Sequence, residues 1–266
     1  GAVLPPPVAA APHSLAFGGL RLGYGNWHMT VPRLMDFPFR QALRFMVGEE
    51  TSLAVVRQLL LRLLISLPPG GLRVVACDPL RLGAALSDFL PLLEHSSLFP
   101  DTRILSRAAD IESALSREFE RLESIIQKSL GDAYDNWADY NHCHPEAPLP
   151  YTVLIVQDAP AQLSAPSLWY LERILAEGPR CGVCLLISVR EEEFKEPHRR
   201  LQQVLSCEAV PLTGATAPMG GAAHVLSRVE TAEAWPEVGK LQQAIRALSE
   251  RYRESGARGF ADLFST

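Results

Sequence analysis

Residues able to handle a phosphate or a metal ion occur at four places in this sequence, each after an apolar stretch. The first is the run Gly48-Glu49-Glu50-Thr51-Ser52. Its glycine could let backbone N–H groups approach a phosphate, and the hydroxyl of Thr51 or Ser52 could bind Mg²⁺. The alternative is that these hydroxyls cap the helix that follows, as Ser and Thr commonly do. The negative charges of Glu49 and Glu50 would then stabilise that helix, because they lie at the positive end of its dipole.

The other three places each include a charged residue; they are Asp78, Gln157-Asp158 and Arg190. A carboxylate in such a position could bind a metal ion or accept a proton from water. An arginine could contact a phosphate or a neighbouring subunit. The alternatives are structural: Asp158 could cap the next turn, and Arg190 could form a surface ion pair.

Each of these places ends a stretch with the pattern of a buried strand. The predicted strands are residues 42–47, 72–77, 151–156 and 181–188, and helical patterns occupy residues 52–67, 111–127 and 167–176. Apolar strands separated by helices predict an α/β fold with a mainly parallel sheet that is covered by helices on both faces. Ligands of such sheets bind beyond the carboxyl ends of the strands, so we expect the four places to converge there.

The two ends of the chain differ from this central pattern. Residues 1–12 are rich in proline and alanine and predict a flexible linker. Two β-like runs, 15–22 and 27–31, flank a turn sequence and predict an N-terminal β-hairpin. Residues 13–266 are expected to form one domain. Its last part, 238–266, would be a helix and a tail that could link to another module.

Composition narrows the class of protein. The net charge of −5 argues against a broadly basic surface that grips nucleic acid. No apolar run approaches the roughly 18–20 residues that span a bilayer, so we expect no direct membrane insertion. Five cysteines without a framework spacing fit a reduced, cytoplasmic location. Cys181 and Cys184 have CxxC spacing, but they enter a predicted buried strand, so we expect core residues and no metal site.

Several short motifs occur in an order that resembles the FtsK/SpoIIIE/HerA-type motor ATPases. They are Asp78-Pro79-Leu80-Arg81, Arg117-Glu118-Phe119-Glu120-Arg121, Asn136-Trp137-Ala138-Asp139-Tyr140-Asn141, Leu149-Pro150-Tyr151 and the strand from Gly182 to Arg190. The resemblance covers roughly residues 15 to 190 and implies a RecA-like P-loop NTPase fold. Proteins of this family are hexameric or tandem-module machines that move DNA or, in the EccC-like branch of type VII secretion, proteins.

The first nucleotide motif of that family, Walker A, is not intact here. A working loop reads GxxxxGK[ST], in which lysine neutralises phosphate charge and the hydroxyl binds Mg²⁺. The corresponding run, 48–52, has one glycine, no lysine and two glutamates. A carboxylate about 4 Å from a phosphate is repelled by roughly 4 kcal/mol at an effective dielectric near 20. The resemblance therefore implies a vestigial phosphate site, with Asp78 nearby.

The second motif, Walker B, has changed as well. The family pattern ends in Asp-Glu, where Asp lies near Mg²⁺ and Glu polarises the attacking water. Here Gln157 is uncharged, and Asp158 is one methylene shorter than the expected glutamate. Arg190 matches an arginine that follows the sensor strand of the family.

These departures predict a pseudo-ATPase module. It would serve as a scaffold, regulatory or partner-binding part of a larger translocase or secretion machine. We expect no cofactor. The expected partners are other ATPase modules of the same or another chain, and a protein substrate; the charge does not indicate DNA. The vestigial site could accept a basic side chain through Glu49, Glu50 and Asp158. The alternative function is an active ATP-dependent DNA or protein translocase that binds ATP and Mg²⁺ through a non-standard loop.

Overall fold

A parallel sheet forms the centre of the molecule. The computed structural model describes residues 13–24, 27–39, 43–46, 49–190, 209–210, 217–218, 226–230 and 236–263. The strand order is β4 (Leu72–Cys77), β5 (Tyr151–Ala159), β6 (Val183–Val189), β3 (Leu43–Met46) and β7 (Ala209–Val210), and all neighbours run parallel. The α/β fold with a mainly parallel sheet is therefore confirmed.

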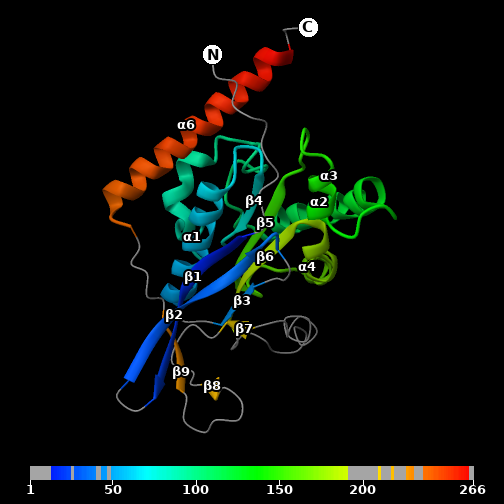
Figure 1. The fold of residues 1–266 in the computed structure, drawn as a ribbon. Coiled ribbons are helices and arrows are strands. Elements are labelled where there is room, and N and C mark those ends of the chain that lie inside the picture. The colour runs from blue at the N-terminus through cyan, green and yellow to red at the C-terminus, as the bar shows by residue number, and fades with distance from the viewer. Residues whose placement is uncertain are drawn as a thin grey trace.

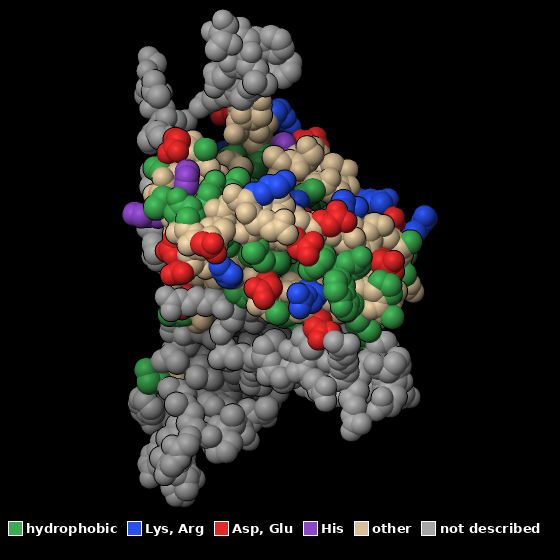
Figure 2. All heavy atoms as spheres, turned by 90° about the vertical axis from the view of Figure 1, so that its right-hand side faces the viewer, with side chains coloured by type: hydrophobic (Ala, Val, Ile, Leu, Met, Phe, Trp, Pro, Cys, Tyr) green, Lys and Arg blue, Asp and Glu red, His purple; other side chains and the backbone are tan. Residues whose placement is uncertain are grey.

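Helices cover both faces of this sheet (Figure 1). On one side lie α1 (Glu49–Ser66) and α6 (Val238–Leu263), with the 3₁₀ segment η1 (Ala84–Leu92). On the other lie α2 (Ala108–Ser124), the π-helical turn η2 (Ile125–Leu130), α3 (Trp137–Cys143), α4 (Ala165–Glu177) and the 3₁₀ turn η3 (Pro179–Cys181). The outer surface of this second side faces the viewer in Figure 2.

A second, antiparallel sheet contains the predicted hairpin. It joins β1 (His13–Tyr24) to β2 (Trp27–Phe37), so the N-terminal hairpin is confirmed. The sheet continues through β9 (Leu226–Glu230) to β8 (Ala217–Pro218), in the order β2-β1-β9-β8. The sequence pattern did not predict this extension, because β9 pairs with a strand at the opposite end of the chain.

The core lies between the central sheet and its helices. Every residue of β5 is buried, and α1 contributes buried residues on almost every turn, among them Val56, Leu60 and Leu64. Burial on most sides explains why α1 has an apolar rather than an amphipathic sequence. No helix in the described ranges is both long and apolar enough to cross a membrane. The predicted linker, residues 1–12, lies outside the described residues.

A glycine contact joins the start of β6 to α3. Gly182 has φ +72°, and a Cβ atom at this position would lie 2.2 Å from Cδ1 of Trp137. Trp137 is itself buried, and its ring stacks on that of Tyr140. The glycine therefore allows the indole ring to approach the backbone closely enough to fill the space beneath it.

Replacing Gly182 by alanine should destabilise the fold by about 3 kcal/mol, because overpacking against Trp137 adds to backbone strain. Gly70→Ala is the matched control, since Gly70 has φ +85° and an added Cβ would meet no atom within 4 Å. Gly70→Ala introduces the backbone strain without the overpacking, and we expect this strain to cost about 1 kcal/mol. Urea unfolding of both variants measures the difference; equal losses would show that the Trp137 contact does not limit this position.

Candidate functional site

The carboxyl ends of β4, β5 and β6 bring three of the four predicted places together. Cys77 of β4 pairs with Val156 of β5, and Val156 pairs with Ile187 of β6. The residues that follow, Asp78, Gln157 and Ser188, therefore lie next to one another along one edge of the sheet. All three are at most 1% exposed.

Ser188 connects the two residues at the Walker B position. Its hydroxyl donates to Oε1 of Gln157 over 2.8 Å and accepts the backbone N–H of Asp158 over 2.7 Å. Sequence reasoning did not select Ser188 as a site residue, although it lies in a quoted motif. The Nε2 atom of Gln157 is buried and has no hydrogen-bond partner within the described part of the chain.

Asp158 forms an ion pair with Arg81. The Nη1 atom of Arg81 donates to Oδ2 of Asp158 over 2.5 Å, and Asp158 is only 2% exposed. Burial raises the pKa of Asp158, whereas the positive charges of Arg81 and, more weakly, Arg190 lower it. The backbone N–H of Arg190 donates to Ala159 O. The Asp158 side chain thus binds an arginine and does not cap the next turn.

Asp78 holds the start of η1 in place. Its Oδ2 atom accepts the backbone N–H of Ala85 over 3.0 Å, and the residue is fully buried. Its other oxygen, Oδ1, has no hydrogen-bond partner among the described residues. The negative charge of Asp78 also raises the pKa of Asp158.

The connection between β3 and α1 is the fourth predicted place. Gly48 lies outside the described residues, and only the backbone is described at Glu49, Glu50, Thr51 and Ser52, which form the first turn of α1. Because β3 ends at Met46 and α1 begins at Glu49, only two residues separate the strand from the helix.

Neither placement of Gly48 in the Walker A pattern puts all the loop positions between β3 and α1. With Gly48 as the second glycine, the first glycine falls on Leu43 and the loop positions fall largely on β3, which pairs with β6. With Gly48 as the first glycine, the loop positions fall on α1. The lysine position holds Glu49 in the first case and Ala54 in the second.

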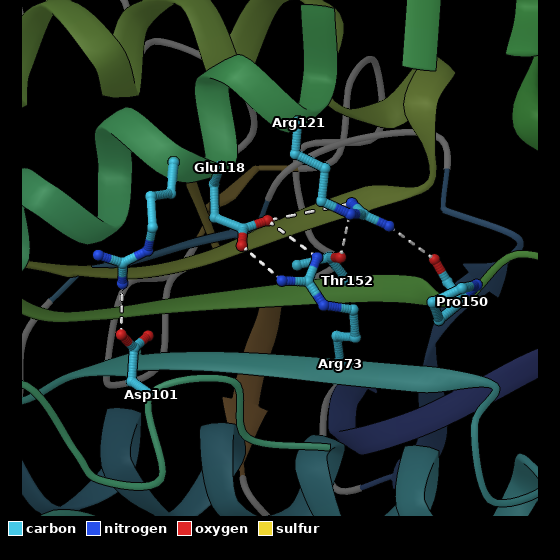
Figure 3. A network of polar contacts seen from close by, with 7 residues as sticks. Arg73, Asp101, Glu118, Arg121, Pro150 and Thr152 are labelled. Atoms are coloured by element: carbon cyan, nitrogen blue, oxygen red, sulfur yellow. Dashed lines mark hydrogen bonds and ion pairs between the residues drawn. The ribbon is translucent and has the colours of Figure 1, made fainter. Parts of the chain in front are cut away.

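The Arg-Glu-Phe-Glu-Arg motif forms a structural network under α2 (Figure 3). Glu118 accepts Nη2 of Arg73 over 2.9 Å, and Arg121 donates to Thr152 Oγ1 over 3.1 Å and to Pro150 O over 3.2 Å. Burial, with the nearby charge of Arg73, lowers the pKa of Arg121 to about 10. The network ties α2 to the starts of β4 and β5, at the opposite end of the sheet from Asp158.

A second motif residue fixes the segment that leads into β5. The amide of Asn141 donates to Leu149 O over 3.0 Å and accepts Leu149 N–H over 2.9 Å. Asn136 caps α3 by accepting the N–H groups of Ala138 and Asp139. These two asparagines therefore have structural roles.

The cysteines of the CxxC sequence are core residues. Burial raises the pKa of Cys181 to about 11 and that of Cys184 to about 12, so both are thiols at neutral pH. A search of the described ranges finds no group of three or more His, Cys, Asp or Glu residues that could hold a metal ion.

Comparison with known proteins identifies the fold. No family model matches the sequence, and no curated protein matches it. Among solved structures, EssC (ATPases 2 and 3) from Geobacillus thermodenitrificans is similar at a TM-score of 0.60 and 14% identity, over 96% of this chain and 53% of that one. EccC (ATPases 2 and 3) from Thermomonospora curvata, in complex with a signal sequence peptide, has a TM-score of 0.60 and 13% identity. The match covers 93% of this chain and 48% of that EccC chain.

The cytoplasmic domain of EccC, the type VII secretion ATPase of Thermomonospora curvata, is also similar, with a TM-score of 0.57 and 15% identity over 92% of this chain and 32% of that one. This chain spans about half the length of the EssC and EccC chains that hold ATPases 2 and 3. These likenesses show that the chain shares the fold of the EssC and EccC ATPase domains, as the motifs predicted.

Removing Arg81 should make stability depend more strongly on pH. In Arg81→Ala, the pKa of Asp158 rises further because burial is no longer opposed by that charge. A folded-state pKa above the unfolded one makes the ionised carboxylate costly, so stability falls as pH rises above the unfolded pKa of about 4. We expect a loss of about 2–3 kcal/mol near pH 7 and a much smaller loss near pH 4.

Urea unfolding at the two pH values tests this expectation. The double variant Arg81→Ala, Asp158→Asn is the control, since it has no carboxylate to ionise and should lose the extra pH dependence. A loss in Arg81→Ala that is the same at both pH values would contradict the role of this ion pair.

Glu118 should be far more important for stability than its neighbour Arg117. Replacing Glu118 by glutamine leaves the partly buried Arg73 and Arg121 without a counter-charge, which should cost about 3–5 kcal/mol. Arg117 also forms an ion pair, with Asp101, but its side chain is 54% exposed. Arg117→Gln should therefore cost less than about 1 kcal/mol. Thermal and urea unfolding of the two variants compare the losses directly.

Proposed function

We propose that this chain is a degenerate FtsK/SpoIIIE-like ATPase module, which acts as a scaffold, regulatory or partner-binding part of a larger translocase or secretion machine. The likeness to EssC and EccC supports the kind of machine. Two of the matched chains hold two ATPases, and this chain spans about half of each. One module of this fold beside another is thus the arrangement we expect.

The connection between β3 and α1 is the observation that carries the proposal. Two residues cannot supply the run of backbone N–H groups that surrounds a β- and a γ-phosphate. The lysine position holds glutamate or alanine, so the charge that would balance the phosphates is also missing. Geometry and charge therefore both oppose nucleotide binding at this place.

The Walker B end supports the same function. A catalytic carboxylate must contact a water molecule, but Asp158 is buried and paired with Arg81. Gln157 directs its oxygen to Ser188 and carries no charge for Mg²⁺. The sequence led us to expect that Asp158 would accept a basic side chain. Arg81 of the same chain supplies that side chain.

The expected partners follow from this role. The first expected partners are other ATPase modules, because the matched chains contain two ATPases each. A protein substrate comes second, supported by the EccC structure that holds a signal sequence peptide. A cytoplasmic location is supported by the likeness to a structure described as the cytoplasmic domain of EssC. The net charge of −5 does not favour DNA.

Calorimetric titration with ATP and Mg²⁺ tests the proposal, followed by a hydrolysis assay. We expect no binding tighter than about 1 mM, which corresponds to roughly 4 kcal/mol, and no turnover above that of a heat-denatured sample. An intact FtsK-like ATPase domain is the positive control in both assays.

Tight binding with turnover would overturn the proposal and favour the active translocase. In that case Asp158→Asn should abolish hydrolysis, whereas Glu146→Gln, at an exposed position, should leave it unchanged. Binding without turnover would leave a nucleotide-dependent structural switch, and the pseudo-ATPase proposal would then hold for catalysis but fail for binding.

A further inference from the structure

Three aromatic rings form a cluster on the outer side of the layer made by α2 and α4. Phe119 of α2 meets Trp169 and Tyr170 of α4 with ring centroids 5.1 and 5.7 Å apart, and the Trp169 and Tyr170 centroids are 5.2 Å apart. Trp169 is 45% exposed, while Phe119 and Tyr170 are half-buried. We call these three residues the aromatic cluster.

The core beneath is complete without Trp169. Leu115 and Leu122 of α2, and Leu171 and Ile174 of α4, are buried and form the inner faces of these helices. Trp169 is two residues before Leu171 on α4, which places it on the outer side of that helix. A large exposed ring supported by two others is a common centre of a protein–protein interface.

Glutamates surround the aromatic cluster on α2. Glu120 follows Phe119 directly, and Glu123 lies four residues after it, on the same side of the helix. Both are exposed, and neither has an ion pair within the described part of the chain. The only polar contact of Glu120 there is with the Ser116 hydroxyl, at 3.4 Å. Figure 2 shows hydrophobic side chains among both acidic and basic ones on this side of the molecule.

Other charged residues on the same two helices include Glu112 of α2 and Glu172 and Arg173 of α4. Glu112 of α2 accepts the Ser164 hydroxyl at the start of α4. Arg173, four residues after Trp169 on α4, is exposed. The surface therefore combines an apolar centre with an excess of negative charge.

We infer that this surface binds a basic amphipathic segment of a partner protein. Apolar side chains of the segment would cover the rings, and a lysine or arginine would lie over the face of Trp169 as a cation–π contact. Other basic groups would pair with Glu120 and Glu123. A second copy of this chain fits poorly, because it would present the same acidic surface and the chain has a net charge of −5. The inference goes beyond the proposed function and holds with or without nucleotide binding.

Fluorescence anisotropy with two labelled synthetic peptides tests the inference. One peptide consists of Leu-Lys-Lys-Leu repeats, and in the other every lysine is replaced by glutamate. We expect the lysine peptide to bind the full chain and the glutamate peptide not to bind. Trp169→Ala should weaken binding at least tenfold, and Trp169→Tyr less. The double variant Glu120→Gln, Glu123→Gln should weaken it about tenfold and reduce its salt dependence.

Matched controls separate this surface from general attraction to an acidic protein. Ile65→Ala removes an exposed apolar side chain from α1, on the other side of the sheet. Glu146→Gln with Glu237→Gln makes the same change in net charge at exposed positions elsewhere. Both controls should change the dissociation constant less than twofold.

Three results would overturn the inference: no binding of the lysine peptide, equal affinity in Trp169→Ala and the native chain, or equal effects of the two glutamate double variants. Sedimentation velocity adds a fourth test. Self-association that Trp169→Ala abolishes would show that the surface binds a second copy instead of a basic partner.

Discussion

The complete burial of β5 is the constraint on which the polar structure depends. Every residue from Tyr151 to Ala159 is buried, yet the strand includes Thr152, Gln157 and Asp158. Buried polar groups need partners, and other elements supply them. Arg121 reaches Thr152 at the start of the strand, and Ser188 and Arg81 reach its end. The motifs that resemble the motor ATPases are in large part the residues that meet this requirement.

Two ion pairs at opposite ends of the sheet illustrate different solutions to the cost of burying charge. At the start, Glu118 is shared by two arginines, and burial is costly enough to lower the pKa of Arg121 to about 10. At the end, Asp158 has Arg81 close by, and burial still raises its pKa. In an ATPase that end of the sheet would be organised around a metal ion and phosphates. Here Asp158 pairs with Arg81 and Gln157 accepts from Ser188, while Nε2 of Gln157 and Oδ1 of Asp78 have no partner among the described residues.

Much of the fold could be predicted from the sequence, because its strands are continuous apolar runs. Residues 72–77 match β4, and the predicted strand 151–156 lies within β5. The predicted helix 111–127 contains most of α2, but the structure begins the helix at Ala108 and changes to a π-helical turn at Ile125. Local periodicity identifies such elements well and their ends poorly.

The contacts of the candidate site were harder to predict. That Asp78, Gln157 and Asp158 would gather at one edge followed from the parallel arrangement. The roles of Ser188 and Arg81 did not, because they depend on the register between β5 and β6 and on the path of the chain after β4. Glu118 was quoted in one motif with Arg121, which follows it by three residues on α2, but its other partner, Arg73, comes from β4 and lies 45 positions away in sequence. Pairwise polar contacts of this kind leave no periodic signal.

The pairing of β1 with β9 has a consequence for how the chain acquires its fold. Gly19 and Glu230 are neighbours in the sheet although they are roughly 200 positions apart, so this pairing has a very high contact order. A ribosome must synthesise nearly the whole domain before β9 can join the hairpin. Until then the edge of β1 offers unpaired N–H and C=O groups to any other extended chain. The nascent chain is thus exposed to misassembly throughout most of its synthesis, and a chaperone that covers the hairpin would protect it.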